Sequence, residues 1–211
     1  MIVEDGASMR RVWHAPCRYR HDMSPGGHLV TTIAACAVTA YATGSTALTA
    51  AVAAGGFLID VDHAIDYVLF EGQRDLRPGT FLRYYIEGRV RRAVLVLHSY
   101  ELFAVLGAIA WWTQAPMLSA YLIGALLHLA LDITFNGRVT PYSIAAFYSF
   151  GYRWAYRFDA VALLGIAERP VAGGFWTAFF QGSPPLERLP KRGEPRTEAR
   201  ARVLATHVGP E

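Results

Sequence analysis

Charged residues are almost missing from two long stretches of this 211-residue chain. Residues 29–59 contain no Asp, Glu, Lys or Arg, and residues 93–131 contain only Glu101. A soluble domain carries charge every few residues, and its core helices rarely run past about 20 residues without a polar face. Both stretches exceed the roughly 20 apolar residues that cross a bilayer. The missing charge therefore predicts an all-α integral membrane protein.

Cysteine is scarce as well. Cys17 lies in a polar segment and Cys36 in an apolar one, so no disulfide framework is indicated. The remaining composition divides the chain into a polar N-terminal leader (residues 1–27), a membrane-embedded helical domain (residues 28–182) and a polar tail (residues 183–211). We expect the tail to be disordered and cytoplasmic.

Each apolar stretch is too long to be one membrane helix. Residues 29–59 would form a helix of about 46 Å, against a hydrocarbon core of about 30 Å. The run Gly44-Ser45-Thr46 interrupts the first stretch, and Trp111 to Pro116 interrupts the second. These breaks predict four helices in two short hairpins, at residues 28–43, 46–64, 93–113 and 117–135.

Two further segments are less apolar. Residues 71–92 combine charges with aromatic residues, which predicts an interfacial helix or loop. Residues 160–180 are interrupted by Glu168 and Pro170 and are compatible with a fifth crossing, a re-entrant piece or a surface-lying segment. The predicted fold is a polytopic bundle of two hairpins plus one or more C-terminal helices.

The basic residues indicate how such a bundle is oriented. The two hairpin turns carry no Lys or Arg, whereas the segments at the other helix ends carry many. By the positive-inside rule these ends are cytoplasmic. The N-terminus then lies on the cytoplasmic side of an inner membrane.

Ionisable residues within the apolar helices gather at the same predicted depth. They fall into four groups that are far apart in the sequence: His28; Asp60, Asp62, His63 and Asp66; His98 and Glu101; His128 and Asp132. Such residues are costly in a membrane and are usually functional or paired. Imidazole nitrogens and carboxylate oxygens suit Zn²⁺, Mn²⁺ or Fe²⁺.

The spacing favours a shared metal centre. His128 and Asp132 are four residues apart, and Asp60 and His63 are three apart, so each pair lies on one helix face. The set exceeds what one tetrahedral ion needs, which favours two ions bridged by an Asp. For three members a purely structural role stays open: His98 in a helix–helix hydrogen bond, Asp66 as a cap or as a partner of an Arg in the following loop, and Glu101 as an ion-pair partner of Arg91 or Arg92.

At these residues the chain resembles the small bacterial membrane-bound metal-dependent hydrolases of the YdjM type. The matching positions are His28, the run Leu58-Ile59-Asp60-Val61-Asp62-His63, the pair His98-Ser99, and His128 through Asp132. Two positions depart from the family pattern: Ile59 replaces a Pro, and Ala93 stands where a motif His would fall. The resemblance implies a divalent metal, zinc above all, as cofactor. It also implies hydrolysis of a lipid-like ester or phosphoester by metal-activated water.

On this hypothesis His28, Asp60, Asp62, His63, His98, His128 and Asp132 are metal ligands, and Glu101 or Asp66 is the catalytic base. A metal-free lipid phosphatase is disfavoured because its Pro-Ser-Gly-His loop is missing. A non-enzymatic membrane metal binder or transporter stays open as the alternative. The expected partners are the lipid bilayer and a lipid-like substrate but no nucleic acid; a homo-oligomer is left open.

Overall fold

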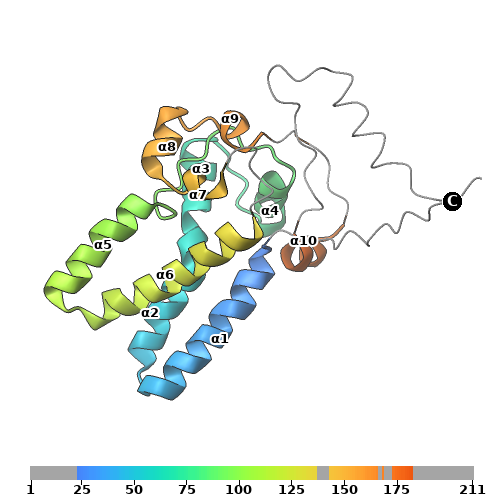
Figure 1. The fold of residues 1–211 in the computed structure, drawn as a ribbon. Helices are drawn as coiled ribbons and strands as arrows, with labels where there is room; N and C mark the ends of the chain where they lie inside the picture. Colours follow the sequence, from blue (N-terminus) through green and yellow to red (C-terminus); the bar gives the residue numbers. More distant parts are fainter. Residues whose placement is uncertain (1–22, 137–142, 166–167, 169–172, 183–211) are drawn as a thin grey trace, which may run out of the picture.

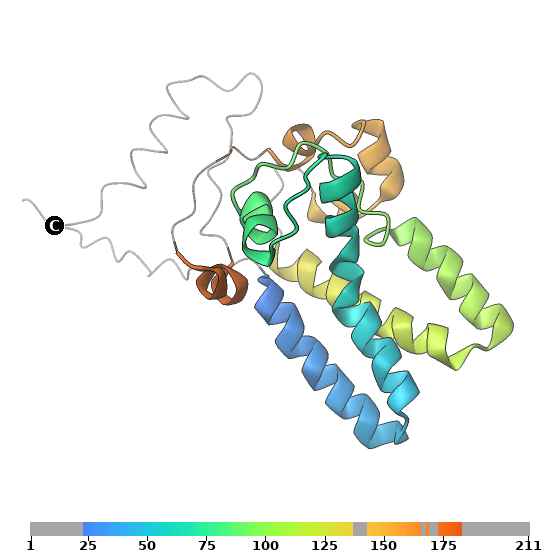
Figure 2. The ribbon, with the colours of Figure 1, turned by 180° about the vertical axis from the view of Figure 1, so that it is seen from behind.

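The computed structural model describes residues 23–136, 143–165, 168 and 173–182, and within them the regular structure is helical, with one isolated bridge between Arg92 and Asp159. The all-α class is therefore confirmed for the described part of the chain. The predicted leader lies largely outside these residues, and the predicted tail lies outside them. The two long hairpins extend away from a cluster of short helices (Figure 1), and the view from behind shows the same division (Figure 2).

The first hairpin consists of α1 (Pro25–Thr43) and α2 (Thr46–Gly56). Ser24 caps α1, because its hydroxyl accepts the Gly27 N–H. Gly44 ends α1 in the left-handed conformation at φ 63°, which favours glycine. The Ser45 hydroxyl then caps α2. The predicted break at residues 44–46 is confirmed.

The helix predicted at residues 46–64 is bent. After α2 the chain makes a 3-10 turn, η1 (Leu58–Asp60), and continues as α3 (Val61–Leu69), with a bend of 47°. The predicted single helix at residues 46–64 is therefore interrupted, and its second part continues to Leu69. The bend matters for the site because it carries Asp60, Asp62 and His63.

The second hairpin consists of α5 (Tyr100–Thr113) and α6 (Pro116–Phe135). Gln114 turns the chain at φ 51°, and Pro116 begins α6, so the predicted turn is confirmed. The predicted start of the third helix at residue 93 was wrong. Residues 93–99 form a loop, and the helix begins only at Tyr100.

The two hairpins meet where α2 crosses α6, and glycine makes the crossing possible. A Cβ atom at Gly124 would collide with the Val52 carbonyl oxygen, and one at Gly55 would collide with the Tyr121 carbonyl oxygen. Small residues of this kind let helix backbones approach closely, as in membrane helix pairs. The crossing brings the end of α2 beside the middle of α6.

Short helices cover one end of the hairpins: α4 (Pro78–Ile86), α7 (Ile144–Phe147), α8 (Phe150–Ala155), α9 (Ala160–Leu164) and α10 (Phe175–Gln181). The helix α4 lies within the segment predicted to be interfacial. Neither α9 nor α10 is long enough to cross a bilayer. These two helices make up most of the described part of residues 160–180.

Among the described residues, α6 is the one unbroken helix that is long and apolar enough to span a membrane. The bent pair of Thr46–Gly56 with Leu58–Leu69 would make a second, and α5 is apolar but shorter. The predicted polytopic arrangement therefore stays a prediction.

Candidate metal centre

Seven of the predicted site residues come together at one end of the hairpins. They arrive from five segments: His28 from α1, Asp60 from η1, Asp62 and His63 from α3, His98 from the loop before α5, and His128 and Asp132 from α6. Three trios have ligand-capable atoms within 4.8 Å of one another: His28, His128 and Asp132; Asp60, His98 and His128; Asp62, His63 and His98. These buried groups can hold a metal ion.

Three ligand atoms, one each from Asp60, His98 and His128, lie within metal-binding range of one another, and an oxygen of Asp132 adjoins them. The Nε2 atoms of His98 and His128 are 3.2 Å apart, and Asp60 Oδ1 is 3.4 Å from each of them. Asp132 Oδ2 lies 3.4 Å from His128 Nε2 and 4.0 Å from His98 Nε2. Ligands in tetrahedral contact with Zn²⁺ at its usual bond lengths lie about 3.3 Å apart. The arrangement is therefore close to that of a coordination shell.

The Nδ1 atoms of His98 and His128 already have hydrogen-bond partners. His128 Nδ1 donates to the Gly56 carbonyl oxygen at 2.9 Å, so its proton must be on Nδ1 when the ring is neutral. His98 Nδ1 lies 3.0 Å from Asp62 Oδ2. A far ring nitrogen bound in this way is typical of metal-binding histidines. Both Nε2 atoms then present lone pairs to each other and to two carboxylates, an arrangement that requires a cation or a proton between them.

A proton is the competitor of a metal at this point. Burial lowers the pKa of His98, but its hydrogen bonds with Asp60 and Asp62 outweigh burial and raise the pKa to about 9. Without a metal, one proton between the two Nε2 atoms, which are 3.2 Å apart, can take its place.

His28 and His63 flank the four central atoms. His28 Nε2 binds Asp132 Oδ1 at 2.9 Å, and its ring stacks on that of His128 with centroids 3.8 Å apart. His63 Nε2 lies 3.6 Å from Asp60 Oδ1. The Nδ1 atoms of both rings are buried and have no hydrogen-bond partner in the described residues. Both rings thus keep an uncommitted nitrogen beside the centre.

Asp62 is occupied differently from a typical metal ligand. Besides holding the His98 ring, its Oδ2 atom accepts the backbone N–H groups of Leu97 and His98 at 3.0 and 3.3 Å. The neighbouring Asp66 accepts the N–H groups of Val94 and Leu95 through its own Oδ2 at 2.7 and 3.0 Å. Both carboxylates therefore hold the loop that presents His98.

The two predicted bases are committed to backbone groups. Asp66 is bound to the His98 loop through Val94 and Leu95. Glu101 accepts the Ser149 hydroxyl and the N–H groups of Phe150 and Gly151, at the start of α8. Neither Asp66 nor Glu101 belongs to the three metal-competent trios.

The arginine that completes this loop was not among the predicted site residues. Arg153 in α8 is fully buried, and its guanidinium donates to the carbonyl oxygens of Val94, Leu95, His98 and Phe147 at 2.7–3.1 Å. In the sequence it is one of many arginines that follow the apolar helices. No local pattern distinguishes it from the exposed Arg157, so sequence reasoning had no signal for it.

Position 93, where the resembling family has a His, lies at the start of the same loop. Ala93 is buried, and its N–H donates to the Phe158 carbonyl oxygen at 2.9 Å. Its side chain lines a pocket of about 570 Å³ that also contacts the His/Asp cluster. The space beside the cluster at this point is therefore apolar.

The pocket of about 570 Å³, named the apolar pocket, is lined mainly by apolar residues and at one end by the His/Asp cluster. Its polar lining includes His28, Asp60, His63, His98 and Asp132, and its apolar lining includes Leu58, Phe81, Leu82, Ile86, Phe175 and Phe179. Asp60 and His63, with side chains 32% and 30% exposed, are the least buried members of the cluster. They are the groups that a molecule in the pocket would meet first.

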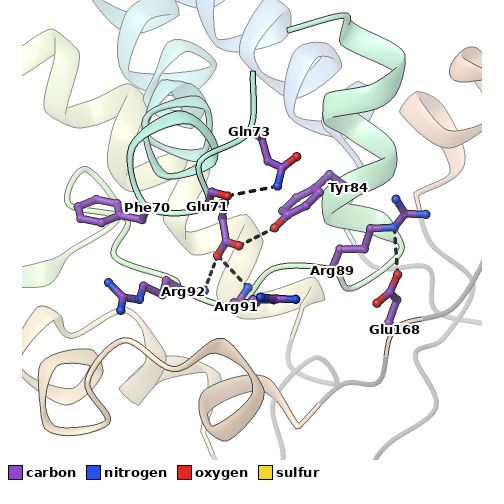
Figure 3. Close-up of a pocket in the computed structure, with 8 residues that line it drawn as sticks. All are labelled: Phe70, Glu71, Gln73, Tyr84, Arg89, Arg91, Arg92 and Glu168. Carbon is purple, nitrogen blue, oxygen red and sulfur yellow. Dashed lines mark hydrogen bonds and ion pairs between the residues drawn. The ribbon is translucent and has the colours of Figure 1, made fainter. Parts of the chain in front are cut away.

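A second pocket, of about 580 Å³, is polar and lies beside the loop that follows α4 (Figure 3). Glu71 organises it, because its carboxylate accepts the N–H groups of Arg91 and Arg92 and the Tyr84 hydroxyl. The hydrogen bonds of Glu101 go to the start of α8 instead, so its pairing with Arg91 or Arg92, the structural alternative for this residue, is not seen in the described residues.

No family model, curated protein or solved structure matches the chain. The functional conclusion therefore depends on the geometry of the His and Asp residues and on the apolar surfaces around them.

Proposed function

We propose that this protein is an integral membrane, metal-dependent hydrolase that acts on a lipid-like ester or phosphoester at the cytoplasmic face of an inner membrane. The cofactor is a divalent metal, with Zn²⁺ first and Mn²⁺ or Fe²⁺ as the other candidates. The observation that carries the metal site is the mutual proximity of the two histidine Nε2 atoms and Asp60 Oδ1, with Asp132 Oδ2 only 3.4 Å from His128 Nε2.

The apolar surface of the hairpins supports a membrane location. Large apolar side chains face outward along α1, α5 and α6, among them Ile33, Val105 and Ile123. Aromatic residues mark the hairpin tips, where Tyr41 is 95% and Trp112 is 88% exposed. An apolar face with aromatic residues at its end is typical of a helix that crosses a bilayer.

The chemistry would combine a cation with the residues on the pocket wall. A bound divalent cation would polarise the scissile group and lower the pKa of a water. Asp60 is positioned to contact both the cation and a substrate. With Glu101 and Asp66 held elsewhere, His28 and His63 are the two imidazoles on the pocket wall with an uncommitted ring nitrogen, and the more exposed His63 is our candidate for proton transfer.

One observation favours the alternative, a non-enzymatic membrane metal binder or transporter. Four protein ligands around one ion would complete a tetrahedral shell, as in structural zinc sites, whereas catalytic sites keep a position open. A two-ion centre would avoid this. His28, His128 and Asp132 would bind one ion, and Asp60 with His98 would bind the other.

Metal content is the first test. We expect purified protein to contain one or two divalent ions by mass spectrometry, and His128→Ala or Asp132→Asn to lose at least one. Asp75→Asn, which removes an exposed carboxylate outside the cluster, is the matched control. Wild-type protein without metal, or unchanged metal content in both site variants, contradicts both functions.

Activity separates the two functions. Release of water-soluble head groups from a panel of phospholipids, abolished by a chelator and restored by Zn²⁺ or Mn²⁺, would support the hydrolase. Bound metal without any hydrolysis would favour the binder or transporter. Cysteines placed at Ser45 and Gln114 test the topology, since labelling from the cytoplasmic side would contradict it.

A further inference from the structure

The apolar pocket has two chemically different ends. The His/Asp cluster forms one polar group of lining residues, in which the ligand atoms lie within a few ångströms of each other. The rest of the lining is mainly aliphatic and aromatic; α4 and α10 contribute much of it, and residues 90–95, α7 and α9 contribute further apolar side chains. The volume of about 570 Å³ is within the usual range for a small-molecule site. Such a split fits a ligand with a polar head and an apolar tail.

The aromatic wall is built by α10. Phe175 and Phe179 line the pocket and stack with ring centroids 5.7 Å apart. Trp176 is 67% exposed and does not line the pocket. One side of this helix therefore closes the pocket, and the other side presents an indole to the surroundings.

The wall is attached to the rest of the molecule at both ends. The Ser24 hydroxyl donates to the Phe180 carbonyl oxygen at 3.0 Å, and the ring of Phe180 covers Gly26 so closely that a Cβ there would collide with it. At the other end the Arg83 guanidinium donates to the Gly173 carbonyl oxygen at 3.0 Å. Because α1 and α4 both hold α10, the pocket is a built feature of the fold.

We infer that the apolar pocket binds one hydrocarbon chain of a membrane amphiphile between α4 and α10, with its head group against Asp60 and His63. The inference deepens the proposed function and rests on it for the identity of the substrate. That substrate would be a single amphiphile whose hydrocarbon chain and head group occupy the two ends of one pocket. Chain binding itself requires only the apolar walls, so it is measurable with or without metal.

The test uses a photoactivatable long-chain fatty acid with a diazirine near its end. The full-length protein is reconstituted in vesicles of phosphatidylethanolamine and phosphatidylglycerol, irradiated, and its adducts mapped by mass spectrometry. We expect adducts on the pocket walls, at Leu82 and Phe179, besides those that any bilayer lipid would leave on outward residues such as Ile33. Excess unlabelled fatty acid should suppress the pocket adducts and leave the outward ones.

Two variants fill the pocket from opposite walls. Leu82→Trp and Phe179→Trp should each reduce the pocket adducts by about tenfold, since forcing a larger ring into an occupied apolar space disfavours the occupant by at least this factor. Ile33→Trp, on the outward face of α1, is the control and should change nothing in the pocket. If both filling variants fail to fold, the adduct map and the competition in wild-type protein still decide.

The inference would be overturned if adducts were confined to the outward faces. It would also be overturned if excess fatty acid did not suppress the adducts in the pocket. The outcome is separate from that of the proposed function. Pocket labelling in a protein that binds no metal would leave the chain site standing and remove the hydrolase. A metal-loaded protein with an unlabelled pocket would do the reverse.

Discussion

The two central histidines are held by opposite means. His128 lies on α6 and is oriented where α2 and α6 cross, a contact made by glycines and one backbone carbonyl, that of Gly56. His98 lies on a loop that three charged side chains hold: Asp62, Asp66 and Arg153. A helix satisfies its own backbone hydrogen bonds, so it can be placed by close packing alone. A buried loop cannot, and its N–H and C=O groups must be bound by side chains.

Of the substitutions that test how the two histidines are held, Arg153→Met is expected to have the largest effect. The substitution removes the donor for four buried carbonyl groups and leaves them unpaired. We expect a loss of about 3–5 kcal/mol in the free energy of unfolding and loss of metal binding, measured by thermal unfolding and metal content. The exposed Arg157→Met is the matched control. An unchanged stability would show that the loop does not depend on the guanidinium.

The glycine crossing should be the next most sensitive. A Cβ at Gly124 meets backbone of α2, which cannot move aside without separating the helices. We expect Gly124→Ala to destabilise the protein by about 1–3 kcal/mol. Gly107→Ala on α5, where a Cβ meets nothing within 4 Å, should be neutral or slightly stabilising. If the two substitutions had equal effects, close packing of α2 against α6 would not be what positions His128.

Asp62→Asn tests whether the loop clamp also tunes the metal. An amide retains an oxygen for the loop N–H groups but no longer stabilises the Nδ1 proton of His98. We expect metal affinity to fall by about 10- to 100-fold, measured by competition with a chelating dye. Asp66→Asn is the matched control, because Asp66 binds the same loop without contacting His98. If both variants lower the affinity alike, the effect of Asp62 is on the loop and not on the ring.

The smallest expected effect is the dependence of stability and metal affinity on pH. Because the folded-state pKa of His98 is raised to about 9, its proton stabilises the metal-free protein at low pH. This contribution is fully present below the unfolded pKa of about 6.5 and is lost as the pH rises through about 9. Metal must displace that proton, so its apparent affinity should rise by about tenfold per pH unit between these values. A flat affinity profile would mean that His98 is not a ligand.

Much of the centre was visible in the sequence, for a physical reason. Ionisable residues in apolar segments are rare, so His28, Asp60, His128 and Asp132 stood out against their neighbours. The turn at Gly44 and the start at Pro116 were equally local, since each depends on the backbone preferences of a few residues.

The loop at residues 93–99 was not visible, and the reason is equally physical. Its side chains are as apolar as those of a membrane helix, so hydropathy alone predicted that a helix begins at residue 93. The atoms that keep it from being a helix belong to Asp62, Asp66 and Arg153, far away in the chain. The roles of Asp66 and Glu101 were hidden in the same way, because the backbone groups that they bind become neighbours only after folding.

The sequence by itself determined that this chain is helical, where its hairpins turn, and which ionisable residues lie in its apolar segments. Only the tertiary structure decided that two imidazoles face each other 3.2 Å apart and that their far nitrogens are already bound. Composition and periodicity act over a few residues, whereas the direction of the His128 ring is decided by a hydrogen bond to Gly56, 72 positions away in the sequence. The candidate metal centre therefore depends on the fold for its geometry and on the sequence for its chemistry.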